Sequence, residues 1–472
     1  MHPLGRVLAF SQKCRRFSTN VIDPNSIQPK LCVVGSGPAS FYAAQQILKA
    51  LPKVQIDIFE RLPVPFGLVR FGVAPDHPEV KNVINTFTKT AQDPRVKFIG
   101  NVKLGQDVSL AELQNAYHSV LLAYGAEEDR LLGIPGENLD NILSAREFVG
   151  WYNGLPNNKD LKFNLNIEKV AIIGQGNVAL DVARILLSPI DLLKKTDITE
   201  YSLAALADSK VKEVKLIGRR GPLQVAFTIK EFREMLRLPR CFVNMNAEDF
   251  AGLDAIVPNL PRPRKRLTEL LMKSISTSKE TEADKCFNPI FFRTPKSFQS
   301  GEDASSVGAL TVAVNTMEGE NAVETDVLET IECGLVLRSI GYKSIQADSA
   351  IPFNSKRGLV ENSGGVIQPG LYVSGWLGTG PVGVILSTMT NAFAVGQTMA
   401  SDILNNTVDA SIKKPGFEFI GSLLKKKGIQ TVSFADWEQI DKVEQSRGKE
   451  KGKLREKIVD VKEMLTIASG KP

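Results

Sequence analysis

Two glycine-rich turns are the parts of this sequence best suited to chemistry. The first turn, Gly35 to Ser40, follows the apolar run 31–34 and precedes a segment of helical composition, 41–48. Gly35 allows a tight turn, and Gly37 lets a pyrophosphate approach the backbone. The N-terminus of the following helix attracts the anion. This arrangement predicts a dinucleotide site.

The segment after this helix completes a strand–helix–strand unit. A second apolar strand, 54–59, ends on Glu60, which lies 20 residues after Ser40. The Glu60 carboxylate suits hydrogen bonds from an adenosine ribose, and Pro38 suits the first turn of a helix. Ser40 stands where a third glycine is usual, so we expect slightly looser helix–strand packing without loss of the site.

The second turn, Gly174 to Ala179, also follows an expected strand, 169–174, and precedes a helical segment. The next strand, 214–217, ends not on an acid but on Gly-Arg219-Arg220. A carboxylate at this position selects NAD, whereas paired arginines bind a 2′-phosphate. We therefore expect NADP(H) here, the alternative being an exposed basic turn without a ligand.

Two dinucleotide sites in one chain suggest an internal electron relay between a bound flavin and a nicotinamide. A late segment fits that expectation. Residues 370–376 resemble a strand, and 385–404 have helical composition. Gly383, Val384 and Ile385 would place backbone N–H groups of this helix start near the flavin ring.

Composition limits the number of domains and argues against a membrane span, a redox dithiol and a metal site. The chain has 472 residues, enough for two or three domains, with 43% hydrophobic and 23% charged residues. No apolar run is long enough to span a membrane. The five cysteines form no CxxC pair, which argues against a redox dithiol or zinc ribbon, and three histidines make a histidine metal site improbable.

Residues 1–20 are basic, rich in hydroxyl side chains and free of acids, which is typical of a mitochondrial presequence. An uninformative N-terminal tail is the alternative. Removal of these residues would leave 54 basic against 52 acidic residues, a net charge of +2. Attraction to an acidic partner must then come from a local patch.

Four runs of the sequence, 65–80, 174–184, 218–228 and 375–383, closely resemble the mitochondrial NADPH:adrenodoxin (ferredoxin) oxidoreductases. The resemblance extends from about residue 30 to the C-terminus and is weakest over 245–325. It implies an α/β fold of two Rossmann-like dinucleotide-binding domains, in which the NADP domain is inserted into a discontinuous FAD domain. The implied parts are the presequence 1–20, FAD domain 30–142, NADP domain 143–342 and FAD domain 343–472.

The resemblance also implies an activity. NADPH would reduce FAD, and the electrons would pass one at a time to a small [2Fe–2S] ferredoxin in the mitochondrial matrix. This output serves P450 steroid hydroxylation, iron–sulfur cluster assembly or both. Peripheral association with the inner membrane is left open, and nucleic-acid binding is not expected because no aromatic residues interleave the basic stretches.

The site residues carried over from the family fall into two cofactor groups. The FAD group comprises Gly35, Gly37, Pro38, Ala39, Glu60, Leu68, Leu104, Trp376, Gly383, Val384 and Ile385. The NADPH group comprises Gln175, Gly176, Asn177, Val178, Arg219, Arg220, Glu231 and Gly383.

Two weaker signals concern proton handling and partner docking. His77, together with Asp181, would relay or orient a proton near the flavin. The alternative is that His77 belongs to a turn whose hydrogen bonds are satisfied and that Asp181 is a helix-interior carboxylate. Arg233, Arg262 and Arg266 would attract an acidic ferredoxin, although charged runs are more often solvated surface.

Other functions share the two turns. A disulfide reductase would need CxxC, and a glutamate-synthase-type subunit would need iron–sulfur cysteines, neither of which the sequence offers. A non-catalytic redox sensor that binds both nucleotides is the alternative from a different class.

Overall fold

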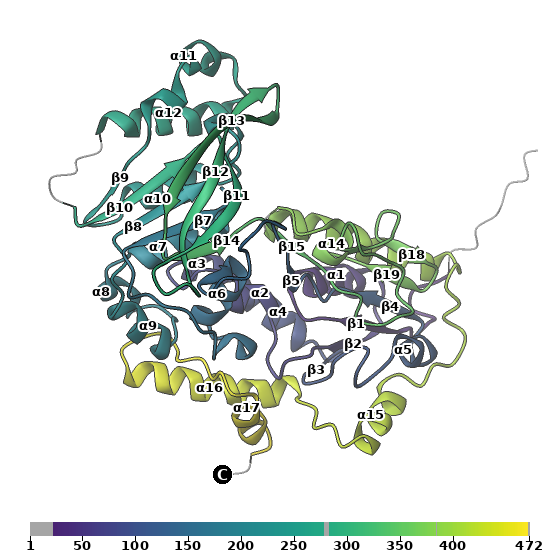
Figure 1. Ribbon diagram of the computed structural model, residues 1–472. Helices are drawn as coiled ribbons and strands as arrows, with labels where there is room; N and C mark the ends of the chain where they lie inside the picture. Colours follow the sequence, from purple (N-terminus) through teal and green to yellow (C-terminus); the bar gives the residue numbers. More distant parts are fainter. Residues whose placement is uncertain (1–21, 278–282, 384, 471–472) are drawn as a thin grey trace, which may run out of the picture.

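The computed structural model describes residues 22–277, 283–383 and 385–470 (Figure 1). The expected presequence, 1–20, and the expected flavin contact Val384 lie outside these residues. Within them, the chain forms two parallel-stranded α/β units side by side, with C-terminal helices running beneath both (Figure 1).

The first unit is built on a six-stranded sheet in the order β18-β19-β4-β1-β2-β3. Its strands come from both ends of the chain. They are β1 Lys30–Val34, β2 Gln55–Phe59, β3 Val96–Ile99, β4 Ser119–Leu122, β18 Val366–Gln368 and β19 Leu371–Val373. All neighbours are parallel except β18 and β19. The pairing of β19 with β4 shows that this unit is discontinuous in sequence, as expected.

Two helices cover one face of this sheet. Helix α1, Pro38–Ala50, follows the first glycine turn, and α14, Ile385–Leu404, has the expected bounds. They cross closely because α14 presents Gly396, where a Cβ would lie 2.7 Å from the carbonyl oxygen of Ala43.

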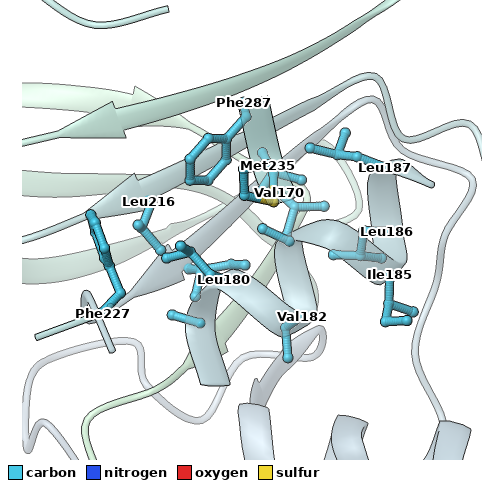
Figure 2. Packing of buried hydrophobic residues seen from close by; sticks show 14 of the residues in the cluster. Val170, Leu180, Val182, Ile185, Leu186, Leu187, Leu216, Phe227, Met235 and Phe287 are labelled. Carbon is cyan, nitrogen blue, oxygen red and sulfur yellow. The ribbon is translucent and has the colours of Figure 1, made fainter. Parts of the chain in front are cut away.

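The second unit is built on a six-stranded parallel sheet in the order β6-β14-β7-β8-β10-β9. Its strands all come from the middle of the chain. They are β6 Ile142–Ser144, β7 Lys169–Ile173, β8 Glu213–Ile217, β9 Cys241–Val243, β10 Lys285–Ile290 and β14 Leu335–Arg338. Helix α7, Asn177–Leu187, buries Leu180 in one apolar cluster with Met235 and Phe287 (Figure 2).

The stretch in which the sequence predicted least contains an antiparallel sheet of β11 Arg293–Ser300, β12 Val307–Glu318 and β13 Asn321–Glu332. It also contains helix α12, Arg262–Thr277, which contacts α10, Ile229–Leu236.

The chain passes between the two units twice, and the two passages lie together. Strand β5, Glu128–Asp129, pairs antiparallel with β15, Tyr342–Lys343. The C-terminal part then forms α15, Phe417–Lys426, α16, Phe434–Glu450, and α17, Val461–Ala468.

Two sequence expectations about the whole chain can be checked in the described part. Among the residues that the structure describes, none of the cysteines at positions 32, 241, 286 and 333 forms a disulfide. Of the helices that the structure describes, none has the length and apolar character needed to cross a bilayer.

Candidate functional site

The first glycine turn has a backbone that only glycine adopts easily. Gly35 has φ = 101°, and a Cβ there would lie 2.5 Å from the carbonyl oxygen of Ala123, just after β4. By contrast, a Cβ on Gly37 would meet no described atom within 4 Å. The turn is therefore pressed against the sheet on one side and open on the side where a pyrophosphate would approach.

Glu60, at the end of β2, is fixed against this turn. Its Oε2 accepts hydrogen bonds from the backbone N–H of Ser36 at 3.0 Å and from the Ser36 hydroxyl at 2.7 Å. Its Oε1 accepts from the N–H of Leu62 at 3.1 Å. The carboxylate is thus held at the strand end, where an adenosine ribose is expected, and that ribose contact remains a prediction.

The late segment meets the start of α1. A Cβ on Gly375, which has φ = 67°, would lie 2.8 Å from the Cβ of Ala39. The strand expected over 370–376 ends at Val373, and Trp376 instead begins the short helix α13, Trp376–Thr379. The reason is the positive φ of Gly375, which turns the chain out of the sheet.

The other expected flavin contacts differ in exposure. Leu68 is exposed next to Gly67, whose Cβ position lies 3.2 Å from the Cα of Gly37. Leu104 is buried in the apolar cluster that contains Val34. Gly383, with φ = 89°, precedes α14, and Ile385 is its first residue. The open glycine, the N-terminus of α1 and the exposed Leu68 fit a dinucleotide that carries an aromatic ring.

The second turn repeats the first. Gly174 has φ = 116°, and its Cβ would lie 2.2 Å from the carbonyl oxygen of Ser339, just after β14. A Cβ on Gly176 would meet no described atom within 4 Å. Asn177 and Val178 form the first turn of α7.

A brace from residues 226–228 holds this second turn. The backbone N–H groups of Ala226 and Phe227 both donate to the carbonyl oxygen of Gln175, at 2.9 and 3.0 Å. The N–H of Thr228 donates to Oδ1 of Asn177 at 2.8 Å.

The paired arginines follow β8 directly. Arg219 is exposed and Arg220 is half-buried, and in the described part of the chain neither guanidinium forms an ion pair. Gly218, directly before them, packs against the end of the Gln175 side chain, which would have to move if a Cβ were added, since that Cβ would lie 2.1 Å away. Two unpaired positive charges at this strand end fit the 2′-phosphate of NADP.

A polar cluster joins the two units beside the second turn. Its centre is the buried Arg184 of α7, which donates to Asp76 at 3.0 Å and to Asp181 at 2.8 Å. The same guanidinium lies 3.5 Å from Glu231 and 3.6 Å from Glu234, both on α10.

His77 belongs to this cluster but bonds to a different residue from the one expected. Its Nε2 lies 2.7 Å from Oε2 of Glu234, whereas Asp181 bonds to Arg184. The sequence suggested Asp181 because it follows the second turn, but α10 lies against α7 and brings Glu234 to the ring. Three further members of the cluster were not predicted from the sequence: Asp76, Arg184 and Glu234. A spacing of three residues between Asp181 and Arg184 was the available signal.

The electrostatics of the cluster favour a proton on one glutamate. Burial, followed by the charge of Asp181, raises the pKa of Glu231 to about 7. Burial also raises the pKa of Asp181, while at Asp76 the Arg184 guanidinium outweighs burial and lowers the pKa. Ligand atoms of His77, Glu231 and Glu234 lie within 4.8 Å of one another, but the adjacent guanidinium opposes a metal ion there.

The basic residues expected to bind a partner lie on α10 and α12. Arg262 and Arg266 are exposed and border a pocket of about 520 Å³ formed by residues 225–229, 261–264, 266 and 267. Between them, Arg264 donates to the carbonyl oxygen of Val225 at 2.7 Å, which ties α12 to the brace of the second turn. Arg233 is half-buried on α10.

Comparison with known proteins places this architecture in a family. A model of the pyridine nucleotide-disulphide oxidoreductases matches residues 29–236. Mitochondrial NADPH:adrenodoxin oxidoreductase of Salvelinus fontinalis is 53% identical, over 93% of this chain and 91% of its own length. The human protein of the same name is 49% identical, over 98% of this chain and 95% of its own length.

A solved structure supports the same assignment. Mycobacterium tuberculosis FprA, in complex with NADPH, superimposes with a TM-score of 0.89 at 34% identity, over 94% of this chain and all of its own. The chain is therefore a mitochondrial oxidoreductase with a mixed α/β fold, and it belongs to the family of the NADPH:adrenodoxin oxidoreductases.

Proposed function

We propose that this chain takes electrons from NADPH by way of bound FAD and delivers them singly to a mitochondrial [2Fe–2S] ferredoxin of the adrenodoxin type. One observation carries the proposal: the strand after each glycine turn ends on side chains of opposite charge. These are Glu60 in the first unit and Arg219 and Arg220 in the second. Each relative whose name includes NADPH and adrenodoxin supports the same function.

The domain bounds and site residues given above belong to this proposal. Residues 30–142 and 343–472 would bind FAD, and 143–342 would bind NADPH. Bound FAD supplies the conversion from a two-electron donor to one-electron transfers. The chain itself would bind both pyrophosphates at helix N-termini, hold the 2′-phosphate between two guanidinium groups and exclude water between the units.

Glu231 and His77 would handle protons in this scheme. Glu231, whose pKa is raised to about 7, lies on helix α10, which the brace at residues 226–228 places beside the second turn. His77 bonds to Glu234 one helical turn further along α10. We propose that Glu231, Glu234 and the His77 ring orient the nicotinamide end of NADPH and take up or release protons there. Asp181 would act through Arg184.

We further propose that the ferredoxin is acidic and docks on Arg233, Arg262 and Arg266. The exposed guanidinium groups at the start of α12 suit carboxylates, and such contacts weaken as salt rises. Charge reversal at Arg262 and Arg266 should slow ferredoxin-dependent cytochrome c reduction and leave NADPH–ferricyanide activity intact. Equal loss of both activities would contradict docking.

Peripheral contact with the inner membrane is a finer proposal, supported by α15. This helix exposes Phe419, and three exposed lysines, Lys425 to Lys427, lie at and just after its C-terminal end. An exposed aromatic side chain and lysines on one helix suit an anionic bilayer surface. Co-sedimentation with cardiolipin vesicles, but not with phosphatidylcholine vesicles, is the expected result, and F419S should reduce it.

One assay separates the proposed function from its alternatives. NADPH should bleach the flavin without oxygen, and cytochrome c reduction should then depend strongly on added [2Fe–2S] ferredoxin. A protein that binds both nucleotides but shows no ferredoxin dependence would be a redox sensor.

A further inference from the structure

A buried cluster of three charges joins three distant segments of the chain. Asp197, before helix α9, Glu200–Ala207, is buried in the second unit. Its Oδ1 and Oδ2 accept hydrogen bonds from Nζ of Lys81 at 2.7 and 2.8 Å. Nζ of Lys457 lies 3.0 Å from Oδ2 and also donates to the carbonyl oxygen of Asp197 at 3.1 Å.

Each residue of this cluster, which we call the clasp, comes from a different part of the protein. Lys81 is the last residue of helix α3, Pro78–Lys81, in the N-terminal part of the first unit. Lys457 follows α16 in the C-terminal part of the chain, which lies beneath both units (Figure 1). The clasp therefore closes around the junction of the two units.

The clasp is largely buried, and it contains two lysines but one carboxylate. The side chains of Lys81, Asp197 and Lys457 are 12%, 8% and 1% exposed. Two ammonium groups share one carboxylate. Burial, followed by the charges of Lys81 and Arg70, lowers the pKa of Lys457 to about 7, although the Asp197 carboxylate acts in the opposite direction. A buried ion cluster of this kind adds little net stability compared with apolar side chains of the same volume. What distinguishes the clasp is directionality, because hydrogen bonds fix the angle between the groups that they join, whereas apolar packing restricts that angle less.

Neighbouring contacts show what the clasp would hold in place. Lys81 lies four residues after His77, which directly precedes the same short helix. Asp76, His77 and Glu79 also reach across to the second unit, where they meet Arg184, Glu234 and Lys230. The exposed Glu79–Lys230 pair is a weak restraint, so Lys81 is the buried anchor at the C-terminal end of α3.

Hydrogen bonds of the C-terminal part of the chain reinforce this anchor. Nζ of Lys453 donates to the carbonyl oxygen of Ile198 at 2.7 Å, next to Asp197. On the other side, Glu444 of α16 accepts from the N–H of Ile458 at 2.9 Å and pairs with Arg70 of the first unit. The C-terminal segment that carries Lys457 is thus bonded to both units, through Lys453 to the second and through Glu444 to the first.

We propose that Lys81 is a positioning residue: held by Asp197, which Lys457 also binds, it fixes the angle at which α3 presents His77 to Glu234 and thereby the spacing of the two dinucleotide sites. The inference rests on the proposed function, since it assigns a purpose to that spacing. Displacement of reacting groups by about 1 Å can slow a reaction by up to about 100-fold, so a small rotation between the units would be costly.

The primary test is Lys81→Met in the FAD-loaded full chain, with Lys81→Arg as the conservative variant and Lys212→Met as the control. Lys212 forms an exposed pair with Glu168 within the second unit. Three quantities are measured: the rate constant of flavin bleaching by saturating NADPH without oxygen, the dissociation constant of NADP⁺, and hydrogen exchange in peptides covering 76–82, 196–200 and 451–458.

For K81M we expect about a tenfold lower rate constant, a dissociation constant within about twofold of wild type, and faster exchange in all three peptides. K81R should recover most of the rate, and K212M should match wild type. A wild-type rate and exchange pattern in K81M would overturn the inference. So would a loss of rate that only matches a loss of bound FAD or of thermal stability.

A second variant covers the case in which K81M does not fold. The triple variant K81M/D197L/K457M replaces the clasp by apolar side chains and leaves no buried charge unpaired. We expect it to fold, bind FAD and react slowly. Folding with a wild-type rate, or failure to fold, would assign the clasp to stability instead. If wild-type protein is not bleached by NADPH, the proposed function fails, while hydrogen exchange still tests the clasp.

Discussion

The two glycine turns share one backbone and differ in the side chains around it. Gly35 and Gly174 have φ values of 101° and 116°, and each faces a carbonyl oxygen at the end of a neighbouring parallel strand. Each turn and its helix lead to a further strand. In the first unit that strand is followed by the fixed carboxylate of Glu60, and in the second unit by the free guanidinium groups of Arg219 and Arg220. In the proposed function, the turn makes a dinucleotide site, and the strand end decides which dinucleotide it takes.

The surroundings of the two turns differ in their side chains. Backbone donors brace both turns: the N–H of Phe66 donates to the carbonyl oxygen of Ser36 at 3.0 Å, and the N–H groups of Ala226 and Phe227 donate to that of Gln175. The carboxylate of Glu60 also binds the first turn, whereas the second adjoins a cluster of charges between the units.

The largest effect should come from alanine in either turn. The new Cβ would lie 2.5 Å from Ala123 at Gly35 and 2.2 Å from Ser339 at Gly174, at a φ that disfavours alanine. We expect a local cost of roughly 3 kcal/mol or more. G35A should be purified without FAD, whereas G174A should retain FAD and lose NADPH binding, as measured by flavin absorbance and NADPH titration.

Gly301→Ala is the control, because its Cβ would have its nearest contact at 3.5 Å. If G174A lost FAD as completely as G35A, the two turns would not serve separate cofactors.

A smaller effect is expected at the strand end of the second site. Removal of both guanidinium groups in R219A/R220A should raise the KM for NADPH about 100-fold, because charge-assisted hydrogen bonds contribute about 1.5–3 kcal/mol each. Turnover with NADH, which has no 2′-phosphate, should hardly change. An equal rise in KM for both cofactors would show that the arginines do not read the phosphate.

The pH dependence of stability should distinguish the charged cluster from the first site. The raised pKa of Glu231 means that the folded chain resists its ionisation and the unfolded chain does not. The free energy of unfolding should therefore fall as pH rises from the ordinary glutamate pKa of 4.5 to about 7. In urea titrations from pH 5 to 7.5, E231Q should flatten this fall, and an unchanged slope would contradict the assignment.

The smallest effect is expected at Ser36, beside the first turn. S36A removes the hydroxyl donor to Glu60 but keeps the backbone N–H donor, so we expect a loss of about 1 kcal/mol in thermal unfolding of the FAD-bound protein. Ser411→Ala is the matched control, since that hydroxyl donates to Asp409 at an exposed position. Equal effects of the two substitutions would mean that Ser36 has no special part in holding Glu60.

The sequence predicted local features well because their determinants are local. Glycines, the apolar strands beside them and the helix start at Ile385 are all read within a few residues, and the two-unit α/β architecture is confirmed. The antiparallel strands β12 and β13 went unpredicted, although Gly319 marks the turn between them, with φ = 61°. Alternating β-branched residues around that glycine were the usable signal.

The charged cluster could not be predicted in the same way. Glu234 reaches His77 across 157 positions of sequence, and Arg184 meets Asp76 across 108. Such pairs depend on how α3, α7 and α10 are packed, and no single segment carries that information. Composition alone also cannot reveal that Lys81, Asp197 and Lys457 share one buried position.

The pairing of β19 with β4 dictates an order of assembly. Every strand of the second sheet lies between residues 142 and 338, so that sheet has all its parts before the chain is complete. The first sheet lacks Leu371–Val373 until much later, and β4 has an open edge in the meantime. A chain growing from its N-terminus would finish its middle first, and a chain cut short before residue 371 would carry an uncovered strand edge that invites aggregation.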